Sequence, residues 1–298
     1  MSRALQAIST AYVAALGFAI AVACAVPYEH PIAIVFAADV AATCAVFAFS
    51  FAFRNSSFYD PYWSVAPPVI AAWWWIGSEG SGEGDARRWL VLALVTIWAV
   101  RLTYNWARGW TGLDHEDWRY VDIQDKAGRA YWAVSFVGIH MLPTLWVFVG
   151  CLPLYVVMAE GVRPLGWLDG VAAFVTAGMI WIEARADKEL FEFKGSERNR
   201  GQTLDTGLRR YARHPNYLGE MGFWWGLFLF GLAANPAWWW TILGAASITL
   251  MFRFVSLPMI EGRMSANRPD YAAYAARTSA VLPWPPRPDR KAEDGIGR

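Results

Sequence analysis

The sequence predicts an all-α, polytopic membrane protein, and three observations support that fold class. The chain has 298 residues, of which 56% are hydrophobic and 17% charged, whereas a soluble domain carries roughly 25% charge. Several windows of about twenty residues contain no charge, and that is the length an α-helix needs to cross a bilayer. The chain has 19 Trp residues, many in clusters such as 73–75 and 238–240, which are typical of the aromatic belts at membrane interfaces.

Eight segments are apolar enough, or nearly so, to span a membrane. They are roughly residues 4–26, 31–53, 61–77, 89–107, 131–158, 166–186, 217–233 and 236–258. The first is too long for the core of a signal peptide, so we expect it to be a spanning helix. The third is the weakest, because it is short and contains Pro61, Pro67 and Pro68. The sequence therefore predicts a bundle of seven or eight transmembrane helices.

The placement of Lys and Arg predicts the orientation of these helices. With eight crossings and both termini in the cytoplasm, 21 of the 26 basic residues fall on the cytoplasmic side and 3 in the outside loops, as the positive-inside rule requires. We expect an additional helix over 1–30, a bundle over 31–286 with cytoplasmic loops at 108–130 and 187–216, and a disordered polar tail over 287–298. Gly222 and Gly226 form a G-x-x-x-G pattern that predicts close helix packing within a monomer.

Several classes of function are excluded by what the sequence lacks. A net charge of +1 gives no basic surface for a nucleic-acid partner. The three cysteines, Cys24, Cys44 and Cys151, lie in apolar runs and form neither a disulfide framework nor a zinc spacing. The four histidines are too scattered to suggest a metal site. There is no P-loop and no G-x-G-x-x-G motif, so we expect neither a metal nor a Rossmann unit.

The most informative stretch leads into the seventh apolar segment. Pro215 suits the first turn of a helix, so we expect this span to begin there with His214 near its cap. Asn216 and Glu220 are four residues apart and therefore share one face, with Tyr217 beside them. A helix cap alone does not explain why an amide and a carboxylate enter the bilayer on one stripe.

Three arginines, Arg209, Arg210 and Arg213, lie just before this helix start. Free backbone N–H groups and the positive end of the helix dipole attract anions, and arginine binds phosphate well. The stretch therefore predicts a site for an anion such as the phosphates of a nucleotide. The arginines by themselves are also explained as a cytoplasmic flank of the span.

A second polar stripe ends the sixth segment. Glu183 and Asp187 are four residues apart, and Lys194 lies seven beyond, so all three share a side if the helix continues into the cytoplasm. Carboxylates beside a basic cluster suit ribose hydroxyls and an adenine amino group. Salt bridges from these carboxylates to Arg209 or Arg213 are an equally good interpretation.

Ionisable groups at membrane depth are costly, so each is a candidate for function. Arg101 lies inside the fourth segment with Asn105 one turn on, and Arg253 lies inside the eighth. A guanidinium at that depth needs an acidic or amide partner, or a ligand. We interpret Asp39 and His140 as structural groups, each satisfied by a neighbouring helix.

Asp60 begins the proline-broken third segment, among Tyr59, Tyr62 and Trp63. Asp followed by Pro is a common helix opening, so the simplest role of Asp60 is a helix cap. A carboxylate beside phenols can also form a proton-donating pair. Both interpretations stay open at this point.

The run from Arg213 to Glu220, Arg-His-Pro-Asn-Tyr-Leu-Gly-Glu, resembles the steroid 5-alpha-reductase family, in particular its uncharacterised bacterial branch. The resemblance covers about residues 55–286 and includes a closing Tyr271-x-x-Tyr274 pattern followed by Pro-Trp-Pro-Pro at 283–286. It implies about seven membrane helices enclosing NADPH on the cytoplasmic side. It also implies a reaction that delivers hydride to the β-carbon of an enone while an acid protonates or polarises the carbonyl oxygen. The first span looks like an addition to that plan.

The resemblance assigns roles position by position. Residues matched to cofactor contacts of the family are Asn216, Glu220, Asp187 and Arg101, with Glu183 where the family often has Asn and Lys194 where it has Arg. Asp60 resembles the active-site Glu, with Tyr59 in place of the adjacent Gln. Together with the residues derived above, the expected cofactor set is Arg101, Asn105, Glu183, Asp187, Lys194, Arg209, Arg213, His214, Asn216, Tyr217, Glu220 and Arg253.

The chain departs from the family at one important position. The proton-donating Tyr, three residues before Arg101, is Trp98 here, and an indole cannot donate a proton to a ketone. The sequence leaves Tyr59, Tyr62 and Tyr104 as candidate acids. Trp98 and Trp63 are then expected to line the substrate pocket.

The favoured function is a membrane reductase that binds NADPH, or NADH, from the cytoplasm and reduces a lipophilic enone drawn from the bilayer. In a bacterium it would lie in the inner membrane among lipids.

The same Arg-His-Pro-x-Tyr run resembles isoprenylcysteine and phospholipid methyltransferases, which bind S-adenosylmethionine. Those enzymes carry an acidic pair before a Tyr-rich tail, and this chain has only Glu261. A non-enzymatic lipid-binding protein is the third alternative.

Overall fold

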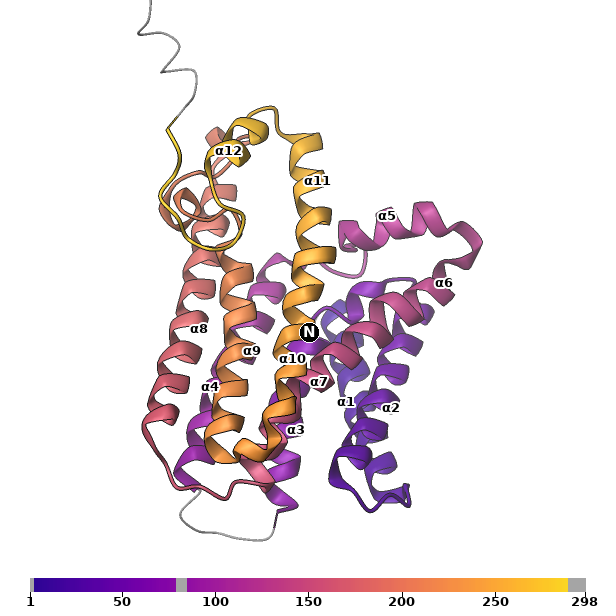
Figure 1. The fold of residues 1–298 in the computed structure, drawn as a ribbon. Coiled ribbons are helices and arrows are strands. Elements are labelled where there is room, and N and C mark those ends of the chain that lie inside the picture. The colour runs from indigo at the N-terminus through magenta and orange to yellow at the C-terminus, as the bar shows by residue number, and fades with distance from the viewer. Residues whose placement is uncertain (1–2, 79–84, 289–298) are drawn as a thin grey trace, which may run out of the picture. The chain divides into compact units, whose positions relative to one another are not determined.

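The structure is a computed structural model that describes residues 3–78 and 85–288, and the regular elements of this part of the chain are helices (Figure 1). The longer helices are α1 (Arg3–Ala25), α2 (Pro31–Phe53), α3 (Tyr62–Ile76), α4 (Asp85–Gly109), α7 (Leu142–Ala159), α8 (Trp167–Lys194), α9 (Pro215–Ala234), α10 (Ile242–Met251) and α11 (Leu257–Asn267). Shorter ones are α5 (Trp118–Ala127), α6 (Tyr131–Val134) and α12 (Tyr271–Arg277). The π-helical turns η3 (Ser135–Met141) and η7 (Phe252–Ser256) join α6 to α7 and α10 to α11.

Six helices within the described residues are long and apolar enough to cross a membrane, which makes the chain a polytopic membrane protein. They cover Arg3–Ala25, Pro31–Phe53, Ala86–Gly109, Trp118–Ala159, Trp167–Lys194 and Pro236–Asn267. All eight apolar segments of the sequence are helical. Two of them continue past their predicted ends, since α8 runs to Lys194 and not 186, and α11 extends the last segment to Asn267 and not 258. Helix α3 has 15 residues, about 22 Å at 1.5 Å per residue, which is shorter than the ~30 Å hydrocarbon core. Helices α3 and α9 are not among the six.

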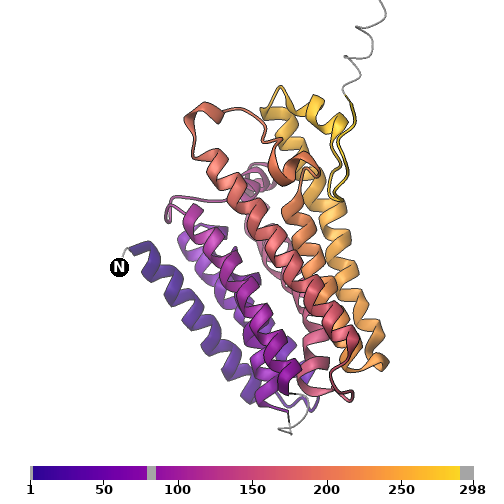
Figure 2. The ribbon, with the colours of Figure 1, turned by 90° about the vertical axis from the view of Figure 1, so that its left-hand side faces the viewer.

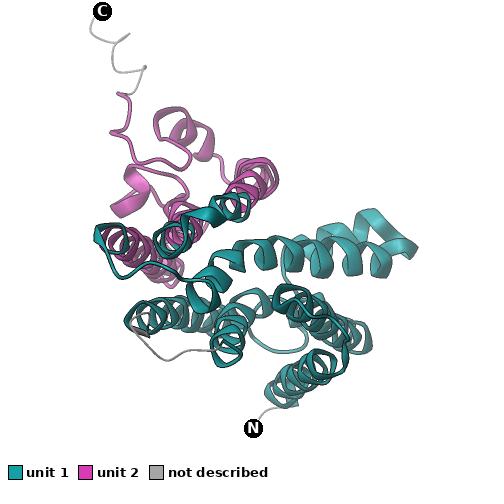
Figure 3. Cartoon of the chain, turned by 60° about the horizontal axis from the view of Figure 1, so that its bottom comes forward, with its two compact units in different colours: residues 1–169, 227–244 teal, residues 170–226, 245–298 magenta. Residues whose placement is uncertain are grey.

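The chain divides into two compact units (Figure 3). Unit 1 comprises Met1–Asp169 and Leu227–Gly244, and unit 2 comprises Gly170–Gly226 and Ala245–Arg298. In unit 1, α1 and α2 lie side by side (Figures 1 and 2), and α3 packs against α4 and α7. Helix α2 ends at Arg54, whose left-handed φ of 52° closes the helix. The side chain of Asn55 then donates to the carbonyls of Leu113 and His115, at 2.8 Å each, and so holds the loop before α3.

A buried ion pair fastens one end of unit 1. Arg87 is one of the three basic residues that the predicted topology counts in the outside loops, but it lies in the first turn of α4 and is 2% exposed. Its Nε is 2.7 Å from Asp169 Oδ1, and its Nη atoms donate to the carbonyls of Arg163 and Pro164. The guanidinium is therefore satisfied on all sides, which is the condition for burying a charge.

Each of the two polar groups interpreted as structural has a hydrogen-bond partner on a neighbouring helix, as predicted. Tyr62 of α3 donates to Asp39 Oδ1 at 2.6 Å. His140 Nε2 lies 3.0 Å from Ser50 Oγ of α2.

In unit 2 the first half of α9 packs closely against α8, and the two helices lie side by side in Figures 1 and 2. A Cβ built on Gly222 would lie 2.4 Å from Met179 Cγ, and one on Gly226 would lie 2.1 Å from Thr176 Oγ1. The predicted use of the G-x-x-x-G pattern is confirmed, because these glycines let two helices of one chain approach each other. Of the predicted polar tail over 287–298, the part from 289 onward lies outside the described residues.

Candidate functional site

The Arg-His-Pro run in unit 2 is held by α8 and by the C-terminal segment. Helix α9 begins at Pro215, as predicted. Just before it, the 3-10 turn η5 (Gly207–Arg210) opens with Gly207 at a φ of +59°, which favours glycine. The amide of Leu208 donates to Glu189 Oε2 of α8 at 3.0 Å. The turn that carries the arginines is therefore fixed to the cytoplasmic end predicted for α8.

Arg213 and His214 are both bound to Glu261 of α11. Arg213 donates from Nε and Nη2 to Glu261 Oε1 at 2.9 and 2.5 Å, and from Nη1 to the carbonyls of Ala275 and Thr278. His214 Nε2 lies 3.1 Å from the same carboxylate oxygen. Burial lowers the pKa of His214. The partner of Arg213 is thus Glu261, and neither Glu183 nor Asp187 forms a salt bridge with it.

The closing Tyr-x-x-Tyr pattern folds onto the same run. Backbone amides of Arg213 and His214 donate to the carbonyls of Ser279 and Ala280 at 2.8 and 2.9 Å. Tyr274 of α12 donates to the carbonyl of Arg209 at 2.6 Å. The two sequence patterns that carry the family resemblance therefore form one continuous structure.

Two buried carboxylates lie where α8 and α9 approach most closely. Glu183 is 4% exposed and Glu220 is 2% exposed. Gly219 brings them to the same level, because a Cβ built on it would lie 2.6 Å from Glu183 Cβ. Trp224 Nε1 donates to Glu220 Oε1 at 2.9 Å and sets the rotamer of that side chain. Glu183 therefore lies at the α8–α9 seam, and Glu220 lies next to Gly219 at the same level of α9.

Two neighbouring side chains carry buried polar atoms without a hydrogen-bond partner in the described part of the chain. They are Arg209 Nε and Asn216 Oδ1, and Arg209 is 9% exposed. Burial lowers the pKa of Arg209, while the charges of Tyr274, Asp187, Glu189 and Tyr217 act in the opposite direction. Asp187, Tyr217 and Arg209 therefore lie within electrostatic range of one another. A buried polar atom without a partner costs about 1–3 kcal/mol, and a ligand would remove that cost.

Lys194, at the end of α8, lines a basic pocket of about 220 Å³ together with Arg200 and Arg268. This pocket adds positive charge beyond the α8–α9 seam. Arg253 lies in η7 and is exposed, and its guanidinium lies 5.5 Å from the centre of the Phe254 ring. The assignment of Arg253 to a cofactor stays a prediction without geometric support.

Asp60, in unit 1, does not cap α3. The residue that precedes α3 is Pro61, and it makes no side-chain cap, so the helix-cap interpretation was wrong. Instead Tyr120 of α5 donates to Asp60 Oδ1 at 2.5 Å. Burial raises the pKa of Asp60 to about 6, against the lowering effect of Arg119. A carboxyl with such a pKa carries a proton in part of the molecules near neutral pH, as a general acid must.

The phenols next to Asp60 in sequence have other partners. Tyr59 shares a hydrogen bond of 2.7 Å with Thr144 Oγ1, and Tyr62 donates to Asp39. The prediction that Asp60 pairs with Tyr59 or Tyr62 was therefore wrong about the tyrosine, because Tyr120 is the phenol that donates to Asp60. Tyr120 is 60 residues away, and sequence spacing gave no signal for it.

The remaining predicted residues lie on or against α4 of unit 1. Trp98 is fully buried, and the centroids of its ring and the Trp63 ring are 6.4 Å apart. Tyr104 is 64% exposed, with the guanidinium of Arg108 over its ring. Asn105 Oδ1 accepts hydrogen bonds from Arg108 at 3.0 and 2.5 Å. Arg101 is partly buried on the same helix.

Residues 46–278 match the model of a family described as protein of unknown function DUF1295. The chain belongs to the DUF1295 family. The match to DUF1295 takes in Asp60, the α8–α9 seam and the Arg-His-Pro run, and it begins within α2, so that α1 lies outside it. An uncharacterised protein of Schizosaccharomyces pombe, C594.04c, is 26% identical over 253 residues, which cover 77% of this DUF1295 chain and 73% of the yeast protein. No solved structure shows a significant match to the chain.

Proposed function

We propose that this DUF1295 protein is a membrane reductase that binds NADPH at the α8–α9 seam of unit 2 and reduces a lipophilic enone. The observation that carries the proposal is the pair of unpartnered buried atoms, Arg209 Nε and Asn216 Oδ1, beside the buried carboxylates of Glu183 and Glu220. A guanidinium N–H suits a phosphate oxygen. Carboxylates accept hydrogen bonds from ribose hydroxyls and from an adenine amino group. The donors and acceptors present therefore fit a dinucleotide.

The basic pocket of Lys194, Arg200 and Arg268 supports NADPH over NADH. The extra phosphate of NADPH adds negative charge, which the three cations attract, although Glu197 also lines the pocket and lies 3.5 Å from Arg200. Arg213 and His214 are bound to Glu261 and the C-terminal segment. We therefore assign them to positioning the loop that carries Arg209, and not to contact with the cofactor.

The cofactor, when bound, supplies the hydride. Within unit 1, Asp60 has a pKa of about 6, which suits a general acid. Tyr120 orients that carboxyl through the hydrogen bond to Oδ1. Assigning the acid to Asp60 removes the difficulty that Trp98 stands where the resembling family has its proton-donating Tyr.

The proposed topology places the cofactor site in the cytoplasm. Eight crossings put 21 Lys and Arg residues on that side and 3 on the other. This count requires α3 and α9 to cross the bilayer in addition to the six longer or more apolar helices. Helix α9 has 20 residues, about 30 Å, so it reaches across the hydrocarbon core, and its polar Asn216 and Glu220 lie in its first turns.

Thermal unfolding of the full chain in detergent, with NADPH, NADH and S-adenosylmethionine in turn, tests the proposal. A ligand at a hundred times its dissociation constant stabilises a protein by about 2.7 kcal/mol, so we expect a clear upward shift with NADPH. Stabilisation by S-adenosylmethionine alone would establish the methyltransferase alternative. No response to any of the three would favour a non-enzymatic lipid-binding protein.

Glu220→Gln provides the matched variant. The Gln Oε1 retains the acceptor for Trp224 Nε1, so the fold is preserved while the negative charge is removed. We expect the NADPH shift to be lost in Glu220→Gln and kept in Glu192→Gln, whose side chain is 62% exposed on the same helix pair. An unchanged NADPH shift in Glu220→Gln would show that the site is elsewhere.

A further inference from the structure

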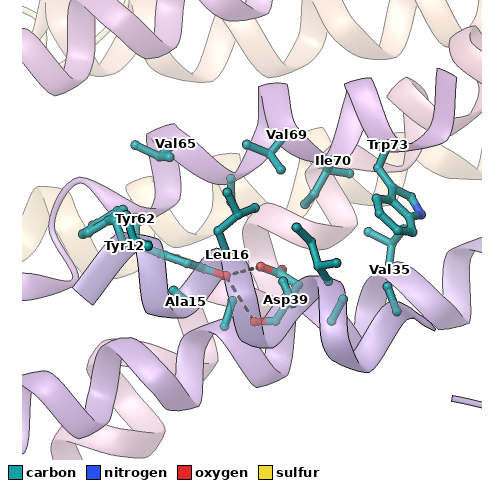
Figure 4. Close-up of a pocket in the computed structure, with 17 residues that line it drawn as sticks. Tyr12, Ala15, Leu16, Val35, Asp39, Tyr62, Val65, Val69, Ile70 and Trp73 are labelled. Carbon is teal, nitrogen blue, oxygen red and sulfur yellow. Dashed lines mark hydrogen bonds between the residues drawn. The ribbon is translucent and has the colours of Figure 1, made fainter. Parts of the chain in front are cut away.

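A separate cavity of about 310 Å³ lies among α1, α2 and α3 of unit 1 (Figure 4). It is lined by 17 residues, and all but a few of them are aliphatic or aromatic. Neither Asp60 nor Tyr120 lines it, so it does not belong to the site proposed above. Its volume is within the range of small-molecule sites, which begins at about 300 Å³.

The cavity opens on a surface that faces lipid. Val13, Leu16 and Ile20 of α1 and Val69 of α3 line it and are 45–72% exposed. Helix α1 is one of the six membrane-crossing helices. An occupant therefore enters from the hydrocarbon of the bilayer, and the wall that it meets is apolar.

One end of the cavity is polar. Figure 4 shows Tyr12 and Tyr62 toward one side, Asp39 next to them and Trp73 at the other end. Asp39 is 5% exposed. Tyr62 donates to its Oδ1 at 2.6 Å and to its carbonyl at 3.1 Å. The hydroxyl of Tyr12 donates to the carbonyl of Phe58 at 3.0 Å.

The second oxygen of Asp39 accepts no hydrogen bond from the described residues. No Lys, Arg or His lines the cavity, so no positive group of the wall can pair with this carboxyl. The bond from Tyr62 to Asp39 Oδ1 is explained by a structural role, because it links α3 to α2. That role explains neither the unused oxygen nor the cavity volume beside it.

We propose that this cavity binds a membrane-borne alcohol, whose hydroxyl donates to Asp39 Oδ2 while its hydrocarbon chain lies along α1 and α3. In this bond Asp39 acts as a carboxylate, whose Oδ2 accepts from the alcohol while Oδ1 accepts from Tyr62. The cavity volume of about 310 Å³ lies at the lower end of the range for small-molecule sites, so an alcohol with a chain of medium length, 1-decanol, is the probe.

Binding of tritiated 1-decanol to the full chain in phosphatidylcholine nanodiscs, with empty nanodiscs as the background, tests the proposal without NADPH. We expect a saturable component of one decanol per chain. Unlabelled decanol should displace it at least about tenfold better than decane or decyl methyl ether, because neither competitor can donate a hydrogen bond. Equal displacement by decane would overturn the proposal and show that the cavity takes any hydrocarbon chain.

Asp39→Asn replaces the free acceptor by an amide donor while Oδ1 still accepts from Tyr62. We expect decanol affinity to fall about tenfold and decyl methyl ether, which can only accept, to become the better ligand. Asp122→Asn, exposed on α5, should leave decanol binding unchanged. Ala66→Leu fills the cavity from α3 and should remove binding of all three compounds. Unchanged decanol affinity in Asp39→Asn would refute the role of the carboxyl, and if that variant does not fold, the ligand series on the native chain still decides.

Discussion

The packing of α9 against α8 at Gly219 holds Glu183 and Glu220 at one level, and a single methyl group tests it. A Cβ at position 219 would lie 2.6 Å from Glu183 Cβ, 2.8 Å from the carbonyl of Met179 and 3.0 Å from the amide of Glu183. Two of these atoms belong to the backbone, so rotation of a side chain cannot relieve the contact. Overpacking of this kind costs about 1–3 kcal/mol.

Gly178→Ala is the matched control, because nothing lies within 4 Å of a Cβ at that position of α8. Ala stabilises a helix interior by about 0.5–1 kcal/mol relative to Gly, so this variant should gain stability. Gly219→Ala has the same gain in stability from helix propensity, but the clash of the new methyl group with α8 reduces it. The two variants should therefore differ by the clash alone, about 1–3 kcal/mol.

The assay is thermal unfolding of both variants and the native chain in one detergent. At about 2–4 °C per kcal/mol, Gly219→Ala should unfold several degrees below Gly178→Ala. The NADPH shift should also be weaker in Gly219→Ala, because the methyl group displaces Glu183 from α9. Equal midpoints for the two variants would refute the close approach of α8 and α9 on which the proposed site depends.

Two further predictions concern unit 1. Asp169→Asn should lower the free energy of unfolding by about 3–5 kcal/mol, because it leaves the buried guanidinium of Arg87 without its charge partner. Glu192→Gln removes an exposed ion pair and should cost less than about 1 kcal/mol. Chemical denaturation measures both losses, and similar values would contradict the burial of the Arg87–Asp169 pair. Asp60 has a pKa of about 6, above its ordinary ~3.9, so the stability it contributes is present below pH ~4 and is lost as the pH rises through 6. The unfolding midpoint of Asp60→Asn relative to the native chain should therefore rise between pH 4 and 7, and a difference independent of pH would show that Asp60 titrates normally.

The sequence by itself determined the membrane character and the helices. Apolar runs and charge placement are local properties of a chain in a bilayer, so the existence of all eight segments and the start of α9 at Pro215 were predicted. The polar extensions of α8 to Lys194 and of the last segment to Asn267 were not, because apolar content does not mark them. Helical spacing also predicted which polar residues share a face, as at Asn216 and Glu220. These statements need only the period of the helix and the cost of a charge in lipid.

Only the tertiary structure decided the partners of the polar residues. Tyr120 reaches Asp60 across 60 residues, and Glu261 reaches Arg213 across 48. Such pairs depend on which helices pack together, and in unit 1 many polar side chains compete for each partner. The unused oxygen of Asp39 is likewise invisible in the sequence, because an unpartnered atom can be recognised only when every neighbour has been placed.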